Sequence, residues 1–378
     1  MKKQNSWKKG ILIAVCIFLA LILIGMIFAT VYVNYLLSRL NRVDPNNEST
    51  MSPSQALDAM LTDPDLETVD PTGNETFIQI DDITFPTELP VPTDPEPTQP
   101  TEAQPTEPKP TEPQPTEPDV YGDHLVNILL VGQDRRPGEG RQRSDSMILV
   151  SFNKSRDTIT LTSFMRDQYV QIPGYKPNKL NAAYSFGGMN LLCQTLAKNF
   201  GVQVDGVVEV DFGGFEDIID LLGGVEIKMT QKEVDYFNTF TDWNLVKGMN
   251  RLNGEQALAY ARLREIDTDY RRAERQRTVV AALIEAYKSQ PLSNLLGLLD
   301  DILPLITTNM SNSEILRYAT DLFPMLSGAQ MNTLRIPLEG TFDAGKVEVR
   351  PGFVAWFQYN IDFAANRDRL YEIFAPAQ

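Results

Sequence analysis

An uncharged apolar run near the amino terminus sets the strongest limit on how this 378-residue chain can fold. Residues 10–33 carry no charge, and four lysines precede them within the first nine residues. A bilayer core of ~30 Å needs ~20 apolar residues in a helix, whereas a cleaved signal peptide has an apolar core of only about 7–15 residues. The run therefore predicts an uncleaved transmembrane helix at 10–33. We expect residues 1–9 to form a cytoplasmic tail and the residues after about 34 to lie outside, because the positive flank stays inside.

The next segment, residues 34–119, has the composition of a linker. From Pro86 onward it reads PTELPVPTDPEPTQPTEAQPTEPKPTEPQPTEP, a Pro-Thr-Glu tract with few apolar residues. Such a tract cannot bury enough apolar surface to fold. We expect 34–119 to be a disordered extracellular spacer, and its last 34 residues could extend to roughly 100 Å in polyproline II form.

The distribution of charge argues against a nucleic-acid partner. Residues 41–119 hold 18 acidic and 2 basic residues, a net charge of −16, whereas residues 1–40 hold five basic residues and no acidic ones. Residues 120–378 have a net charge of only −5. A nucleic-acid-binding domain is expected to be basic, and this one is also predicted to lie outside the membrane.

Cysteine and histidine are too scarce for several kinds of catalytic site. The two cysteines are Cys16, in the apolar run, and Cys193, on an apolar helical stripe, and His124 is the only histidine. A Ser-His-Asp or Cys-His mechanism and a histidine-rich zinc site therefore lack their residues. Cys193 is expected to pack in the core rather than to act as a nucleophile.

Residues 120–378 have the pattern of one folded domain. Short apolar runs bounded by turn residues predict strands, and amphipathic stretches predict helices. The predicted strands are 124–134, 146–153, 158–164, 169–172, 207–212 and 225–229, with two more in the last 90 residues. The predicted helices are 182–201, 215–224, 254–263, 270–289, 293–303, 313–326 and 361–374. This order predicts a mixed α/β (α+β) fold, a three-layer α-β-α domain with one central mixed sheet.

Six arginines lie within sixteen residues of this mildly acidic domain: Arg262, Arg264, Arg271, Arg272, Arg275 and Arg277. The planar guanidinium group binds phosphate oxygens bidentately and keeps its charge. Helical spacing places Arg272, Arg275 and Gln276 on one face, which leaves Arg271 and Arg277 to solvent. The alternative is a solvated charged face, which is the commoner fate of such a run.

Other polar clusters lie where predicted strands and helices begin or end. Asp134 follows the first strand, Asp145 precedes the second, and the pair Arg166-Asp167 follows the third. Two carboxylates beside arginines can hold Mg²⁺ (or Mn²⁺) against substrate phosphates, so Asp134 and Asp145 are candidate metal ligands. The alternative is that each aspartate is a turn or cap residue.

These motifs, taken in order, resemble the LytR-CpsA-Psr family of bacterial cell-wall proteins. The resemblance covers about residues 123–290, and seven motifs in order behind an amino-terminal anchor make it specific. The motifs are D134-R-R, R143-S-D-S-M, R166-D, K179-L-N-A-A-Y, VDFGGFEDIIDLLGGV, LNGEQALAYARLR and DYRRAERQ. Two departures are Met165, where the family usually has proline, and a short spacer between Arg264 and Asp269.

The resemblance implies a membrane-anchored phosphotransferase that faces the cell wall. It would move a glycopolymer phosphate from a polyprenyl-pyrophosphate carrier to peptidoglycan, with Asp134 and Asp145 holding Mg²⁺. The residues implied in substrate binding are Arg143, Arg166, Lys179, Asn181, Arg262, Arg264, Arg272 and Gln276. The residues expected to take part in catalysis are Arg166, Asp167, Arg272 and Arg275.

Several alternatives stay open at this point. The same residues would suit a non-catalytic envelope sensor that binds lipid pyrophosphates, or a polyprenyl-pyrophosphate pyrophosphatase that uses water as acceptor. The apolar residues of 215–224 and 270–289 could line a tunnel for the polyprenyl tail or belong to an ordinary core. Asp269 could orient an arginine or cap its helix. Teichoic acid, capsule and other wall polysaccharides are equally compatible as the transferred polymer.

Overall fold

The computed structural model describes residues 31–44, 47–63, 65–69, 76–85, 120–133 and 141–377. The predicted cytoplasmic tail, most of the predicted transmembrane helix, the Pro-Thr-Glu tract and Asp134 lie outside these residues. Among the residues that are described, none of the helices combines the length and apolar character needed to cross a bilayer.

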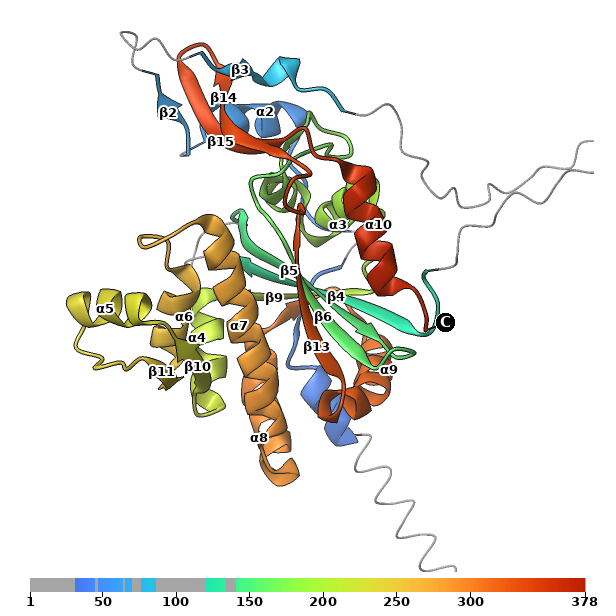
Figure 1. Ribbon diagram of the computed structural model, residues 1–378. Coiled ribbons are helices and arrows are strands. Elements are labelled where there is room, and N and C mark those ends of the chain that lie inside the picture. Colours follow the sequence, from blue (N-terminus) through green and yellow to red (C-terminus); the bar gives the residue numbers. More distant parts are fainter. Residues whose placement is uncertain are drawn as a thin grey trace, which may run out of the picture.

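A seven-stranded mixed sheet forms the centre of the domain (Figure 1). β4 pairs antiparallel with β5 and parallel with β9, and β6 pairs antiparallel with β5 and parallel with β13. In order across the sheet, the strands are β1 (Asn41–Arg42), β12 (Thr307–Thr308), β9 (Gly206–Asp211), β4 (Leu125–Gln133), β5 (Ser144–Asn153), β6 (Thr158–Phe164) and β13 (Gln330–Ile336). The predicted α/β fold around a central mixed sheet is therefore confirmed.

Helices cover both faces of this sheet and make three layers (Figure 1). On one face, α3 (Leu180–Phe200) and α10 (Phe363–Phe374) pack on the main core, which includes Leu129 and Leu149. On the other face lie α4 (Phe212–Leu221), α7 (Asp269–Lys288) and α9 (Asn312–Leu322). Because both faces are covered, β4 reads as a nearly continuous apolar run rather than as an alternating one.

A side lobe extends the layer that contains α4 and α7. It consists of the hairpin of β10 (Val225–Met229) and β11 (Gly248–Leu252), together with α5 (Gln231–Phe240) and α6 (Gly254–Arg262). These elements share a core of their own, centred on Ile219, Ile227 and Phe237. α8 (Leu292–Ile302) follows α7. The sequence analysis missed α5 and β11, whose patterns are short and rich in polar residues.

A second sheet corrects the prediction of a single central sheet. It has four strands in the order β2 (Glu67–Thr68), β15 (Phe353–Tyr359), β14 (Asp343–Arg350) and β3 (Ile78–Gln79). A two-stranded pair, β7 (Tyr169–Val170) with β8 (Asn178–Lys179), lies beside it. The outer strands β2 and β3 come from the segment that was predicted to be a disordered linker.

Part of the predicted linker is therefore folded onto the domain. We call residues 47–63, 65–69 and 76–85 the N-terminal strap. It contains α2 (Pro53–Leu61), which begins with a capping box formed by Ser52 and Gln55. Several of its apolar residues, among them Ala56, Met60 and Ile80, are buried against the domain. The prediction of disorder across 34–119 was wrong for the strap and for β1, because the composition of the tract after Pro86 was extended to residues that carry apolar side chains able to pack on the domain.

Candidate active site

A large cavity of about 1200 Å³ lies between the central sheet and the helices α4, α6, α7, α8 and α9. Leu130 and Val208 are only half-buried although they lie on inner strands, because both border this cavity. The apolar wall from the sheet comprises Ile128, Leu130, Ile148, Val150, Val208 and Val210. The facing wall comprises Phe215, Ile218, Val280, Leu283, Ile284, Leu299, Ile315 and Leu322. The apolar residues of α4 and α7 thus line a cavity, which was one of the two alternatives left open.

One end of the cavity is polar and strongly charged. Six of the residues singled out from the sequence line it: Asp145, Arg166, Arg262, Arg264, Arg272 and Gln276. They come from β5, from the end of β6, from the end of α6 with the loop after it, and from the first two turns of α7. The fold thus brings together charged groups that are more than 100 positions apart in the chain.

A β-bulge directs Asp145 toward this end. Gly132 pairs with Ser146 and Gln133 pairs with Ser144, so Asp145 has no opposite residue in β4. A bulged residue bends its strand and redirects its side chain. The Asp145 carboxylate is about one-third exposed, and it accepts a hydrogen bond of 3.0 Å from Nη1 of Arg166.

Arg166 connects this carboxylate to a second one behind it. Its Nε lies 3.5 Å from Oδ2 of Asp167, and Oδ1 of Asp167 lies 3.0 Å from Nζ of Lys179. Burial lowers the pKa of Arg166, but the carboxylates of Asp167, Asp269 and Asp145 together outweigh it and raise the pKa. Arg166 is therefore a fixed cation at the end of β6. Asp167 orients it from behind rather than lining the cavity.

The arginine run contributes three cations to the same end. Arg262, the last residue of α6, lies over the Phe212 ring at 4.5 Å. Arg264 lies in the loop after it. Its Nε is 3.7 Å from Asp269, and Nη2 of Arg272 is 2.8 Å from the same carboxylate. The side chain of Arg272 is almost fully buried, and its Nε has no hydrogen-bond partner among the described residues.

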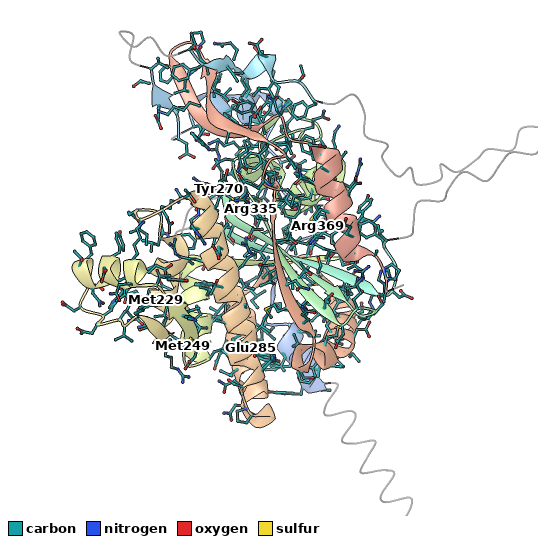
Figure 2. All side chains as sticks on the ribbon, in the orientation of Figure 1. Met229, Met249, Tyr270, Glu285, Arg335 and Arg369 are labelled. Carbon is teal, nitrogen blue, oxygen red and sulfur yellow. The ribbon has the colours of Figure 1, made fainter. Side chains whose placement is uncertain are left out.

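Asp269 is thus shown to orient arginines rather than to cap α7. The N-cap residue of that helix is Thr268, and its side chain makes no capping bond. Burial raises the pKa of Asp269, and the nearby Arg166 partly opposes that shift. The start of α7 is also held by Tyr270, whose ring lies 4.0 Å from the guanidinium of Arg335 on β13 (Figure 2).

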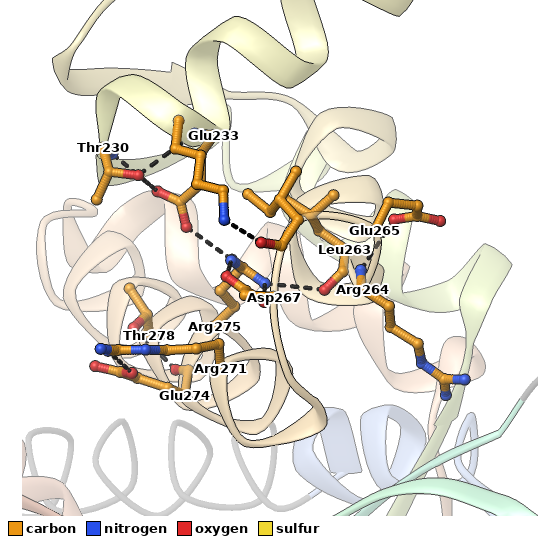
Figure 3. Close-up of polar contacts among 12 residues, drawn as sticks. Thr230, Glu233, Leu263, Arg264, Glu265, Asp267, Arg271, Glu274, Arg275 and Thr278 are labelled. Carbon is orange, nitrogen blue, oxygen red and sulfur yellow. Dashed lines mark hydrogen bonds and ion pairs between the residues drawn. The ribbon is translucent and has the colours of Figure 1, made fainter.

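Two arginines of the run lie elsewhere than predicted. Arg275 points away from the cavity, and its donors reach Glu233, Asp267 and the Leu263 carbonyl (Figure 3). Arg277 was expected in solvent but is 8% exposed and donates to Oγ of Ser163 at 2.8 Å. Both predictions failed because α7 packs on the side lobe and on the sheet as well as on the cavity. Helical spacing shows which side chains share a face of the helix, but not which elements that face packs against.

Arg271 does lie in solvent, as predicted. Its side chain is 65% exposed and pairs with Glu274, at a distance of 2.7 Å.

Three further candidates stand behind the charged end. Arg143 pairs with Asp63 of the N-terminal strap at 2.6 Å. Lys179 is 2% exposed. Asn181 is also buried, and its backbone N–H donates to the carbonyl of Arg166 at 3.3 Å. None of the three lines the cavity, and among them Asn181 contacts a residue that does, Arg166.

A buried carboxylate on β9 was missed. Glu209 accepts hydrogen bonds from the Tyr184 hydroxyl and from Nε2 of Gln133, and Oε1 of Gln133 accepts from the backbone N–H of Gln142. These contacts hold both chain ends that flank residues 134–141. The signal was present in the sequence, because Glu209 is an acid within the apolar strand VVEVD.

The residues at the charged end fit a divalent cation in part. Asp145 is the described member of the predicted pair, and Asp134 lies outside the described residues. Within the described ranges, no group of three or more acidic, histidine or cysteine side chains gathers to hold a metal. Mg²⁺ commonly takes one or two carboxylates and completes its shell with water and phosphate oxygens. A partly exposed Asp145 beside the arginines of the charged end is compatible with that arrangement.

Comparison with known proteins identifies the family of this chain. The sequence model described as the LytR_cpsA_psr family matches residues 98–351, which is more than half of the chain. The chain belongs to the LytR_cpsA_psr family. The resemblance recognised from the seven motifs is therefore confirmed.

Two relatives show how far the similarity to other members of the LytR_cpsA_psr family extends. The polyisoprenyl-teichoic acid–peptidoglycan teichoic acid transferase TagT of Bacillus subtilis (strain 168) is 36% identical over 213 residues, which cover 54% of this chain and 65% of TagT. The regulatory protein MsrR of Staphylococcus aureus (strain COL) is 32% identical over 228 residues, which cover 59% of this chain and 68% of MsrR. The chain thus matches less than two thirds of the length of TagT.

Solved structures share the fold of this chain. TagT bound to LIIa-WTA superposes with a TM-score of 0.53 at 28% identity, covering 69% of this chain and 93% of that one. The Lin1025 protein from Listeria innocua superposes with a TM-score of 0.51 at 26% identity, covering 67% and 97%.

Proposed function

We propose that this chain is a phosphotransferase that moves a glycopolymer phosphate from a polyprenyl-pyrophosphate carrier to peptidoglycan. One observation carries the proposal, namely that a single cavity combines a long apolar body with an arginine-rich end. A polyprenyl pyrophosphate has the same two parts, an apolar tail and a dianionic headgroup. Family membership and the similarity to TagT, a named teichoic acid transferase, support the same activity.

The residues at the charged end suit phosphoryl transfer by positioning and charge neutralisation. A hydroxyl oxygen of the acceptor attacks the phosphorus that carries the glycopolymer. The new P–O bond forms as the bond to the bridging oxygen breaks, and polyprenyl phosphate leaves with that oxygen. Arg166, Arg262, Arg264 and Arg272 bind the phosphate oxygens and stabilise the charge that develops on the leaving group. Gln276, one turn after Arg272, offers a neutral hydrogen-bonding group on the same face.

We further propose that Asp145, together with Asp134, holds Mg²⁺ beside these arginines. The metal would neutralise phosphate charge and orient the pyrophosphate. The one-third exposure of the Asp145 carboxylate and its position in the bulge support this assignment. Because Arg166 already pairs with Asp145, the metal and the Arg166 guanidinium would both contact the Asp145 carboxylate.

A membrane location is proposed with the catalytic domain outside the cytoplasm. The charge-free run at 10–33 and the lysines before it support this placement. Val31 and Tyr35 are exposed at the start of the described residues, and Arg39 lies 3.4 Å from Asp300 of α8. The segment that follows the run is thus attached beside the apolar part of the cavity, where α8 contributes Leu299.

Reconstitution tests the reaction. The full-length chain is incubated in detergent with Mg²⁺, a polyprenyl-pyrophosphate-linked glycopolymer and peptidoglycan, and both products are quantified. We expect polymer to become bound to peptidoglycan with equimolar release of polyprenyl phosphate, and chelation by EDTA to stop both. Equal release without peptidoglycan would identify a pyrophosphatase, and tight binding without any product would identify a sensor.

Filling the cavity should weaken use of long-chain carriers. Leu130→Trp replaces an isobutyl side chain with a larger indole ring, which projects from the middle of β4 into the space that we assign to the polyprenyl tail. We expect KM for a long-chain carrier to rise roughly tenfold or more, as apolar pockets discriminate by about this much. KM for a carrier with a short tail should stay unchanged. Leu130→Met, which conserves volume, is the control, and equal effects on both carriers would contradict the assignment.

A further inference from the structure

The N-terminal strap lies against the charged end, although the family match begins only at residue 98. It is docked by backbone pairing, since β2 joins β15 and β3 joins β14. The backbone N–H of Met51 donates to the carbonyl of Phe186 at 2.7 Å, and the hydroxyl of Tyr175 donates to the carbonyl of Met51 at 2.6 Å. These contacts fix the strap on the domain.

Asp63 of the strap forms a close ion pair with Arg143, near the charged end of the cavity. Its side chain is 6% exposed, and its Oδ2 lies 2.6 Å from Nη1 of Arg143. Its Oδ1 accepts a hydrogen bond of 3.0 Å from the backbone N–H of Asp65, so both oxygens are held. Arg143 lies two residues before Asp145, just outside the bulge. The rotamer of Arg143 is therefore set by a residue of the strap.

Asp65 stands at the outer end of a chain of alternating charges. Its carboxylate is 3.7 Å from Nζ of Lys179, which in turn is 3.0 Å from Asp167. The chain continues through Arg166, at 3.5 Å from Asp167, to Asp145 at 3.0 Å. Lys179 is almost completely buried, and such a cation is tolerated only where carboxylates compensate it. The strap supplies one of those two carboxylates.

We propose that Asp63 and Asp65 are positioning residues for the transfer reaction, holding Arg143 directly and Arg166 through Lys179 and Asp167. This inference rests on the proposed function, because Arg166 is assigned to the pyrophosphate there, and it adds Arg143, whose partly exposed side chain lies two residues before Asp145, as a further arginine that binds the anion. It concerns a segment that precedes the family match, so it is a feature of this chain rather than of the seven motifs.

A purely electrostatic role for the two aspartates makes the opposite prediction. A carboxylate beside a phosphate-binding arginine repels an anionic ligand, so removing its charge should strengthen binding. A positioning role predicts weaker binding in spite of the gain in net positive charge, because the freed arginine must be ordered again by the ligand. The direction of the change separates the two roles.

Asp63→Asn is the test, with binding of inorganic pyrophosphate to the full-length chain measured by calorimetry. We expect binding about tenfold weaker than in the wild type, the lower end of the loss seen when an outer-shell partner is removed. Asp63→Glu should restore part of the affinity. Asp58→Asn, at an exposed position on α2, is the matched control and should bind like the wild type.

A double-mutant cycle makes the result specific. Asp63→Asn should have no further effect on pyrophosphate binding once Arg143→Ala is present, because the aspartate acts through that arginine. Binding that is tighter than the wild type, or unchanged, overturns the inference. Failure of the proposed function is recognised separately, because the wild type would then bind pyrophosphate without forming transfer product.

Discussion

Arg275→Ala should lower the melting temperature of the full-length chain by about 10 °C. The side chain of Arg275 is 5% exposed, and its Nε lies 2.7 Å from Oε1 of Glu233. Nη1 donates to the Leu263 carbonyl at 2.9 Å, and Nη2 pairs with Asp267. Burial lowers the pKa of Arg275, but its bonds to Asp267 and Glu233 outweigh that effect and raise the pKa. Truncation leaves the buried carboxylate of Glu233 without its cation, which costs about 3–5 kcal/mol.

The exposed neighbour Arg271 is the matched control for this prediction. It belongs to the same helix and the same run but pairs only at the surface, so Arg271→Ala should leave the melting temperature unchanged. Arg275→Lys should be intermediate, because a single ammonium cannot reach three acceptors. Differential scanning fluorimetry in detergent measures all three variants. An Arg275→Ala protein that melts like the wild type but loses transfer activity would show that Arg275 takes part in catalysis, as the sequence predicted.

The contrast between Arg275 and Arg272 shows what helical periodicity can predict. Spacing placed Arg272 and Gln276 on one face correctly, and both line the cavity. The same spacing included Arg275, which lies at the edge of that face and turns toward the side lobe. The deciding partner, Glu233, is 42 positions away on α5, a helix that the sequence analysis did not predict. Tertiary contacts of this kind are not encoded in the periodicity of one segment.

The fold was predictable wherever apolar residues are dense. The inner strands β4, β5 and β6 and the helices α4 and α7 were recognised because each buries a continuous face. The N-terminal strap was not recognised, since its buried residues Ala56, Met60 and Ile80 lie in short elements whose partner strands, β14 and β15, are more than 250 positions away. Its ion pair from Asp63 to Arg143 spans 80 positions, and nothing local in the sequence marks it.

The position of Asp145 could be predicted, but the reason for its orientation could not. Its place before an apolar strand made it a candidate, and the structure does bring it to the cavity. The bulge that directs it depends on the register between β4 and β5 at Gly132 and Gln133. Register is a property of the paired strands, so a single strand sequence does not reveal it.

Arg166→Ala should lower kcat/KM for glycopolymer transfer about 10²–10³-fold, the usual cost of removing one group that stabilises developing charge. Arg166 is the residue that links Asp145, at 3.0 Å, with the Asp167–Lys179 pair while also lining the cavity. Arg166→Lys separates charge from geometry. The lysine keeps a positive charge beside the carboxylates of Asp145 and Asp167. Its ammonium group cannot bind phosphate oxygens bidentately, so transfer should still fall markedly.

Arg156→Ala is the control for both variants, because Arg156 precedes the same strand, β6, at its opposite end, and its side chain donates to the exposed Pro376 carbonyl, at 3.2 Å. Transfer of radiolabelled polymer to peptidoglycan and the melting temperature are measured on the same preparations. We expect Arg156→Ala to match the wild type in both. If Arg166→Ala keeps near wild-type transfer while folding normally, the pyrophosphate does not bind at this end of the cavity, and the assignment of the arginine cluster must be abandoned.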